Sequence, residues 1–264
     1  MQLSRSSRWS LRTITYLTIG LVYLPLAIVL VLSFNDSNAL VWPPRGFTTH
    51  WWSTLTDVES AREALATSAR IGLVAMIIAV VLGSLLAFGL QRFEFFGKNA
   101  VSFLAVLPIA LPGIVTGVAL RNTFVRFGWD LGYLSVVVGH ATFCIVVVYN
   151  NVVARLRRMS PNLREASADL GAQPWQTFRY VTWPLMRSAV AAGAILAFAL
   201  SFDEVVVTTF TAGAGVSTLP QWILNNFSRP NVLPYVTVVA TIVMIISLPI
   251  AWLAQRLSDG PRER

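Results

Sequence analysis

The sequence predicts an all-α membrane protein whose chain crosses the bilayer six times. Of the 264 residues, 55% are hydrophobic and only 12% are charged, whereas a soluble domain averages about 25% charged residues. Mean hydropathy is +0.65. A helix needs about 20 mostly apolar residues to cross about 30 Å of hydrocarbon, and six stretches meet this requirement. The sequence lacks the short alternating segments typical of outer-membrane barrels.

The six apolar stretches make residues 1–264 a single predicted transmembrane domain. They cover about residues 13–33, 64–90, 100–120, 132–152, 188–211 and 232–254. The first stretch is too long for a signal-peptide core and lacks a small-residue cleavage site, so we expect it to be retained. The third contains LPIALPGIVTG, in which Pro108 and Pro112 are expected to bend the helix.

The distribution of basic residues predicts how the chain is oriented. One set of loops and chain ends carries 14 lysines and arginines, and the opposite set carries five. The larger set is Arg5, Arg8, Arg12, Arg92, Lys98, Arg155, Arg157, Arg158, Arg164, Arg179, Arg187, Arg256, Arg262 and Arg264. Because cytoplasmic loops carry the excess of basic residues, both termini and the loop at about 153–187 are predicted to be cytoplasmic. The net charge of +8 is therefore attributed to topology, and no basic face interleaved with aromatic residues indicates nucleic-acid binding.

The loop of about residues 153–187 is predicted to hold two short helices. In MSPNLREASADLGA, Ser160 suits a helix N-cap, Pro161 the first helical position and Gly171 a C-terminal stop. QPWQTFRYVTWP then begins a second helix after Pro174. The loop is too short for a catalytic domain, so we interpret it as a helix, a glycine bend and another helix at the inner face.

Motifs of an energy-coupling or catalytic site are missing from the sequence. There is no phosphate-binding loop, no nucleophile elbow and no cluster of His, Cys and carboxylate residues spaced for a metal. We therefore predict no catalytic residue, no metal site and no cofactor bound by this chain. His140, in the fourth span, is expected to hydrogen-bond a neighbouring helix, and Cys144 to be a small core residue. Such a protein works passively, uses an ion gradient or takes energy from a partner.

Residues 165–184, EASADLGAQPWQTFRYVTWP, bear on that choice. Their spacing follows E-A-A, three residues, G, nine residues and I-x-L-P, with matches at Glu165, Ala166, Gly171 and Pro184. The segment resembles the EAA loop of binding-protein-dependent ABC importer permeases. It departs from that pattern at Ser167, Val181 and Trp183. Other segments are similar to the polyamine (putrescine and spermidine) importer branch, namely SFNDS, GFTTHWW, LPIALPGIVTG, GHATFC, LAFALSFDEVVVTTFTAG and TLP.

This resemblance implies a type I ABC importer permease fold in the bacterial inner membrane and a transport subunit without enzymatic activity. In that family the loop forms a coupling helix in a groove of a cytoplasmic ATPase subunit. The residues that this places at the contact are Glu165, Ala166, Ser167 and Gly171. The implied partners are a second permease, expected to be a homologue, two ATPase subunits that bind ATP and Mg²⁺, and a periplasmic or extracellular substrate-binding protein. In the family, a loop at the position of residues 211–220 reaches toward that binding protein.

The function expected from the resemblance is import of a polyamine such as putrescine or spermidine, driven by the partner ATPase. Two alternatives stay open. The first is a permease of the same architecture for another small solute, such as an amino acid, a sugar or iron. The second is a gradient-driven secondary transporter, which predicts inverted repeats with broken helices in matching positions. The sequence shows no such repeat, and a secondary transporter gives no reason for the segment at 165–184.

Two acids, Asp203 and Glu204, fall inside a predicted span. An ionised carboxylate in hydrocarbon is costly, so both are expected to face protein or water. Ser201, Glu204, Thr208 and Thr211 are spaced to share one stripe of a continuous helix, with Asp203 at its border. The residues predicted to line the pathway of a cation are Ser201, Asp203, Glu204 and Thr208. The alternative is a structural ion pair between one of the acids and Arg70 in the second span.

Overall fold

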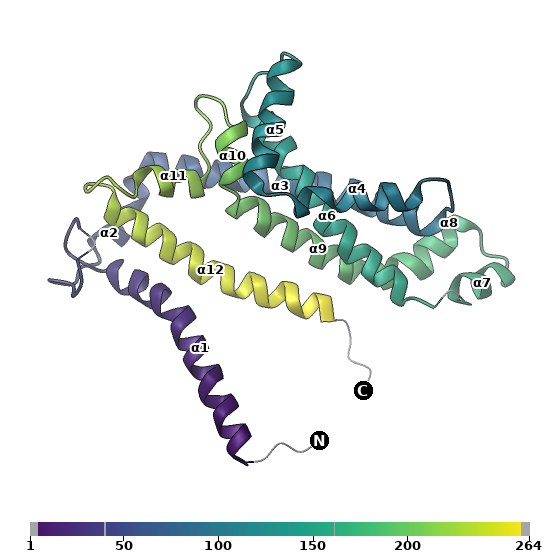
Figure 1. The fold of residues 1–264 in the computed structure, drawn as a ribbon, viewed down its shortest axis with the longest axis horizontal. Helices are drawn as coiled ribbons and strands as arrows, with labels where there is room; N and C mark the ends of the chain where they lie inside the picture. Colours follow the sequence, from purple (N-terminus) through teal and green to yellow (C-terminus); the bar gives the residue numbers. More distant parts are fainter. Residues whose placement is uncertain (1–4, 40, 161, 260–264) are drawn as a thin grey trace. The chain divides into compact units, whose positions relative to one another are not determined.

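The computed structural model describes residues 5–39, 41–160 and 162–259, and most of them are helical (Figure 1). Within these ranges the extended pairing is limited to an isolated bridge between Asn35 and Phe47. The all-α prediction is confirmed. The long helices are α1 (Arg5–Leu32), α3 (Glu59–Arg92), α4 (Lys98–Ala110), α5 (Gly113–Arg126), α6 (Tyr133–Arg158), α9 (Trp183–Asp203) and α12 (Leu233–Asp259). The short ones are α2 (His50–Ser53), η1 (Leu55–Asp57), α7 (Asn162–Asp169), α8 (Pro174–Thr177), η2 (Phe178–Thr182), α10 (Val206–Thr211) and α11 (Leu219–Asn226).

Several helices are long and apolar enough to cross a membrane. Five such segments lie in the described residues: Ser7–Leu32, Glu59–Arg92, Tyr133–Arg158, Pro174–Asp203 and Leu233–Arg256. A sixth crossing results if the bent pair α4 and α5 counts as one span. Each of the six predicted stretches overlaps one of these segments, so the prediction of a multi-pass membrane protein is confirmed.

The third apolar stretch is sharply bent, as its prolines predict. Between α4 and α5 the helix axis turns by 107°. Leu111 is extended, with φ −84° and ψ 144°, because the ring of Pro112 disfavours helical geometry in the residue before it. Pro112 then precedes the first residue of α5. Pro108 lies inside α4 and does not end it.

The fifth apolar stretch is interrupted, and the prediction of one continuous helix over about 188–211 is wrong. Helix α9 ends at Asp203, Glu204 is extended with φ −75° and ψ 115°, and α10 begins at Val206. Neither proline nor glycine stands at this break. The three consecutive valines 205–207 lower the local helix propensity because their branched side chains crowd the preceding turn.

The chain divides into two compact units. Unit 1 falls within Met1–Glu59 and Ile223–Ile246. Its loop is organised by two tryptophans: Trp51 Nε1 donates a 3.0 Å hydrogen bond to the Asn35 carbonyl, and Trp52 Nε1 donates one of 3.1 Å to the Ser33 carbonyl. The Trp51 ring also packs edge-on against Tyr235 at 5.3 Å between centroids. Both indole N–H groups are thus engaged inside the unit, as buried indoles usually are.

Unit 2 falls within Ser60–Trp222 and Ser247–Arg264 and contains the predicted functional segments. Its core is centred on α6, whose Val148 and Val152 are fully buried with Met186 of α9. Close helix approach depends on small residues. A Cβ atom added at Gly83 of α3 would lie 2.7 Å from the Ile145 carbonyl oxygen, and one at Gly193 of α9 would lie 3.3 Å from the Val148 backbone. Glycine at such crossings is typical of packed membrane helices.

Candidate functional site

Helix α7 carries the segment predicted to couple to an ATPase, and its end is built as expected. Gly171 has φ +77°, a left-handed conformation that glycine adopts without strain. Its N–H bonds the Ala168 carbonyl at 2.8 Å, and the Ala172 N–H bonds the Ser167 carbonyl at 3.1 Å. These two bonds form a Schellman motif. Gly171 is therefore confirmed as the C-terminal stop, whereas the predicted role of Pro161 lies outside the described residues.

The second short helix begins at Pro174, as predicted, but it does not end before the fifth span. The backbone N–H of Gln173 donates a 2.7 Å hydrogen bond to Oε1 of Gln176 at the start of α8. From there α8 continues through the π-helical turn η2 into α9. Because α6 also runs on to Arg158, the non-helical part of the loop is shorter than residues 153–187. The fifth span is thus continuous with the second helix of the segment predicted to couple to an ATPase.

Ser167 holds α7 against α8. Its Oγ lies 2.9 Å from Oγ1 of Thr177, and the serine side chain is buried. Glu165 and Ala166, the first two residues of the E-A-A pattern, are exposed, and so is Gly171. Helix α7 therefore turns its third pattern residue inward and leaves the first two free for a partner.

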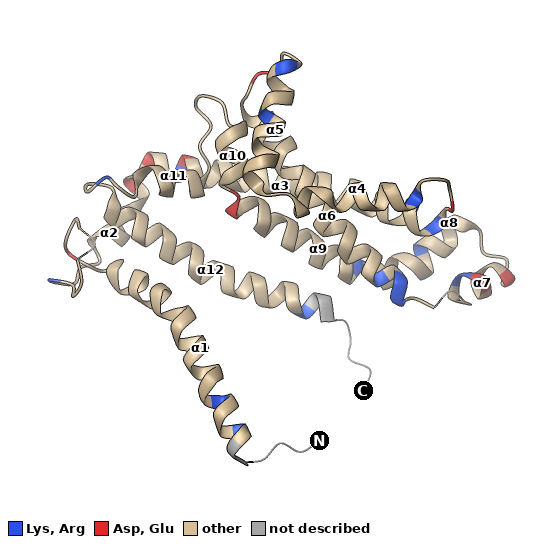
Figure 2. Cartoon of the chain, in the orientation of Figure 1, with Lys and Arg blue, Asp and Glu red and all other residues tan. Residues whose placement is uncertain are grey.

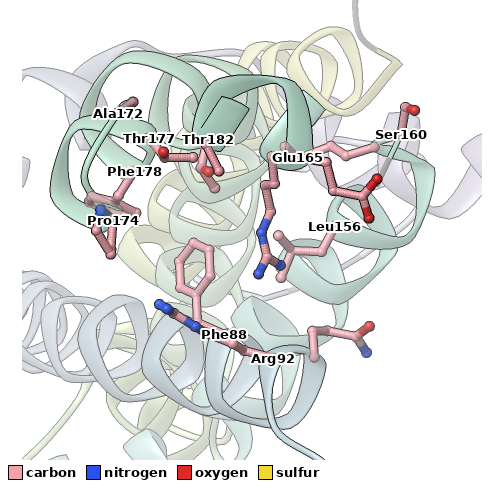
Figure 3. Close-up of a pocket in the computed structure, with 14 residues that line it drawn as sticks. Phe88, Arg92, Leu156, Ser160, Glu165, Ala172, Pro174, Thr177, Phe178 and Thr182 are labelled. Carbon is pink, nitrogen blue, oxygen red and sulfur yellow. The ribbon is translucent and has the colours of Figure 1, made fainter. Parts of the chain in front are cut away.

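A cavity of about 700 Å³ lies between α7, α8 and the ends of α3 and α6 (Figure 3). Phe88 and Arg92 border it from α3, Leu156 from α6 and Glu165 from α7. Phe178 of η2 also faces it and packs against Phe88 at 5.7 Å between ring centroids. Helix α7 contacts α8 and η2, so within unit 2 it packs against the start of the fifth span.

The two acids of the fifth span have different environments. Glu204 is half-buried, and its Oε1 accepts a 2.9 Å hydrogen bond from the Val207 N–H in the first turn of α10. A carboxylate in this place is favoured by the partial positive charge of a helix N-terminus. Asp203 is exposed at the end of α9. Of the two predicted acids, Asp203 is thus the one with a free carboxylate surface.

Ser201 and Thr208 lie on opposite sides of the break and are brought together by His140 of α6. Nδ1 of the histidine is 2.8 Å from Ser201 Oγ, and Nε2 is 2.8 Å from Thr208 Oγ1. All three side chains are buried. The prediction that His140 hydrogen-bonds a neighbouring helix is confirmed. The sequence did not identify Ser201 and Thr208 as the partners of His140. The signal available for this was that all three are polar residues within apolar stretches.

The predicted alternative of an ion pair with Arg70 is absent. Arg70 is exposed, and the ion pair found in the described part of the chain joins Lys98 to Glu94 in another region. The described residues also contain no group of three His, Cys, Asp or Glu side chains that could hold a metal.

The two candidate sites lie at opposite ends of one helix. Helix α9 directly follows α8 and η2 and ends at Asp203. In Figure 2 basic residues lie around α7 and α8, and acidic residues lie at the other end of α9. Its 21 residues span about 30 Å at the usual helical rise. That length matches the hydrocarbon thickness of a bilayer.

Sequence comparison identifies the family. Residues 79–263 match the family described as binding-protein-dependent transport system inner membrane component. The chain belongs to this family. It is 32% identical over 255 residues to the putrescine transport system permease protein PotI of Escherichia coli K12, covering 92% of this chain and 89% of PotI. It is 36% identical over 228 residues to the spermidine/putrescine permease PotC of the same strain, covering 86% and 85% of the two chains. PotC of Haemophilus influenzae is 33% identical, covering 96% and 98%.

Solved structures share the fold. A bacterial ABC transporter that imports alginate superposes with a TM-score of 0.71 over 98% of both chains at 14% identity. An amino acid ABC transporter superposes with a TM-score of 0.61 over 79% of this chain and 97% of its own, at 17% identity. At such identities the likeness concerns the fold. It confirms the ABC permease architecture and, with the family, a transport subunit rather than an enzyme.

Proposed function

We propose that this chain is an inner-membrane permease subunit that forms part of the translocation pathway for a polyamine such as putrescine or spermidine. The observation that carries the proposal is the identity of 32–36% to PotI and PotC over most of each chain. The Pot proteins are named for putrescine and spermidine transport. A polyamine is a flexible cation, and an exposed carboxylate at an interrupted membrane helix is a suitable counter-charge for it.

Asp203 is the residue we assign to direct contact with the cation. Its exposure at the end of α9 supports this role. Glu204 adds negative charge one residue away while stabilising the first turn of α10. Ser201 and Thr208 border the same break, where their hydroxyls contact His140. A single exposed ion pair contributes about 0–1 kcal/mol, so a site with one free carboxylate can guide a cation without trapping it.

The proposed assembly contains a second permease, two ATPase subunits and an external binding protein. Docking of an ATPase at α7 is supported by the exposure of Glu165 and Ala166 and by the Schellman motif that ends the helix at Gly171. The ATPase would bind ATP and Mg²⁺, and this chain would bind no cofactor. The excess of basic residues near α7 supports a cytoplasmic coupling segment and cytoplasmic termini, with α4 and α5 counted as one of six spans.

Another small solute is the alternative cargo. Its support is that the same fold occurs in an ABC transporter involved in alginate import and in an amino acid ABC transporter. A direct comparison is uptake of labelled putrescine and spermidine by cells that lack this chain, with and without its restoration. We expect restored uptake that excess polyamine inhibits and that amino acids, sugars and iron leave unchanged. Restored uptake of one of those solutes without any polyamine uptake would favour the alternative.

A further inference from the structure

The hydrogen bonds at the helix break form a directed chain. Thr208 has one hydroxyl hydrogen, which it donates to the backbone carbonyl of Glu204 at 2.8 Å. Its Oγ1 therefore accepts from Nε2–H of His140. A neutral ring with hydrogen on Nε2 accepts at Nδ1, so the Ser201 hydroxyl donates to that atom. The chain runs from Ser201 through His140 and Thr208 to the carbonyl at the break.

Side chains satisfy two backbone groups at this break inside an apolar stretch: the Thr208 hydroxyl bonds the Glu204 carbonyl, and the Glu204 carboxylate bonds the Val207 N–H. Interrupting a helix leaves backbone groups without their helical partners, which costs several kcal/mol each in hydrocarbon unless other groups satisfy them. The local sequence has neither proline nor glycine to impose the break. The group that bridges the break comes from another helix. It is His140 of α6, which is fully buried and bonds Ser201 in α9 and Thr208 in α10.

We propose that His140 is a positioning residue of the translocation pathway. By tying Ser201 to Thr208 it fixes the geometry of the two residues between α9 and α10, and thereby the direction in which the adjacent Asp203 carboxylate points. His140 is fully buried and does not touch the cargo itself. The inference rests on the proposed function, since Asp203 is taken as the residue that meets the polyamine.

The decisive variant is His140→Phe, which keeps a ring of similar size and removes both hydrogen bonds. Ser135→Ala is a control at the same helix pair: Ser135 Oγ donates a buried 2.7 Å hydrogen bond to the Thr211 carbonyl of α10 and accepts one of 2.7 Å from the Gly132 N–H, so its loss removes two hydrogen bonds of α6 without touching the break. For each variant of the assembled transporter, complex yield, initial rate of labelled putrescine uptake per complex and half-saturating putrescine concentration are measured.

We expect uptake per complex to fall about tenfold in His140→Phe, as the loss of one or two buried hydrogen bonds allows. Ser135→Ala should reduce yield at most, with uptake per complex near that of the unmodified protein. Equal behaviour of the two variants would overturn the positioning role. If His140→Phe does not assemble, Ser201→Ala decides instead, because it removes the α9 half of the bridge and keeps the histidine. Unchanged uptake per complex in Ser201→Ala would also overturn the role.

Combination with Asp203→Asn separates this inference from the proposed function. If His140 acts through Asp203, His140→Phe causes no further loss in the Asp203→Asn background. Losses that multiply would show an independent effect and overturn the inference. If Asp203→Asn alone transports normally, the pathway assignment of Asp203 fails and the inference fails with it. If Asp203→Asn is impaired while His140→Phe transports normally per complex, only the role of His140 fails.

Discussion

Ser167 of α7 and Thr177 of α8 are joined by a hydrogen bond of 2.9 Å between their hydroxyl oxygens. Ser167 stands where the family pattern E-A-A has its second alanine, and it is the residue of α7 that is buried. The departure from the pattern therefore adds a polar link at the inward face of α7, the helix that we propose docks on the ATPase. This link ties α7 to the helical segment that continues into α9.

The first prediction concerns this link. Ser167→Ala and Thr177→Val should each weaken stimulation of the partner ATPase by loaded binding protein, and the double variant should be no worse than either single one. A hydrogen bond of this kind contributes about 1 kcal/mol. Each single variant already removes the whole bond, so the double variant has nothing further to lose. Stimulated ATPase rates of the assembled complex provide the measurement. Fully additive losses would mean that the two hydroxyls act separately.

The second prediction concerns Gly171. Gly171→Pro removes the N–H that bonds the Ala168 carbonyl and forces φ to about −65°, so it should uncouple transport from ATP hydrolysis while membrane insertion persists. Gly171→Asn is the matched control, since asparagine tolerates a left-handed conformation and no atom lies near the position of its Cβ. Polyamine imported per ATP hydrolysed distinguishes them. Equal coupling in both variants would contradict the proposed role of this turn.

Much of this fold follows from local sequence signals, but the interruption of the fifth span does not. Long apolar runs predict the membrane helices, and Pro112 predicts the bend between α4 and α5 because proline constrains its own backbone and that of Leu111. Gly171 predicts the end of α7 for a similar reason. Valines 205–207 are a weak local signal for the break at Glu204, and the His140 side chain that bridges it belongs to α6, so no periodicity within residues 188–211 predicts that contact.

In the candidate site, too, the sequence predicts the residue types but not the contacts between helices. Sequence reasoning found the acids of the fifth span, since ionisable residues are rare in apolar stretches. It placed Ser201 and Thr208 on one helical stripe, whereas the structure connects them through a side chain of another helix. The Ser167–Thr177 bond likewise depends on how α7 folds back on α8. Such contacts between elements are set by tertiary packing.

The third prediction distinguishes the two acids. Asp203→Asn should lower polyamine uptake with complex yield preserved, because an exposed carboxylate is neutralised without loss of an internal bond. Glu204→Ala should also lower complex yield, because the Val207 N–H loses its acceptor, at a cost of about 1 kcal/mol. Glu204→Gln retains an acceptor and should preserve yield.

Uptake and yield are measured together for these variants. Arg70→Gln is the control, since Arg70 pairs with neither acid in the structure. Restoration of yield in the Arg70→Gln, Asp203→Asn double variant would instead favour a structural ion pair in the membrane.

The fourth prediction concerns the loop between α10 and α11, which we expect to face the binding protein. Gly213 packs so closely on the chain that a Cβ atom would overlap the Leu131 carbonyl, whereas Ala214 is exposed. Gly213→Ala should therefore lower complex yield. Ala214→Trp should leave yield intact and weaken ATPase stimulation by loaded binding protein. Unchanged stimulation in Ala214→Trp would leave the loop as a simple connection between helices.

The most direct measurement for the whole account is accumulation of labelled putrescine and spermidine in proteoliposomes that contain this chain with its partner permease and ATPase subunits. We predict accumulation that requires both loaded binding protein on one side and hydrolysable ATP on the other, and that falls in Asp203→Asn. Accumulation driven by a proton or sodium gradient without ATP would contradict the account. So would a complex whose ATPase responds to a binding protein loaded with another solute and that never accumulates a polyamine.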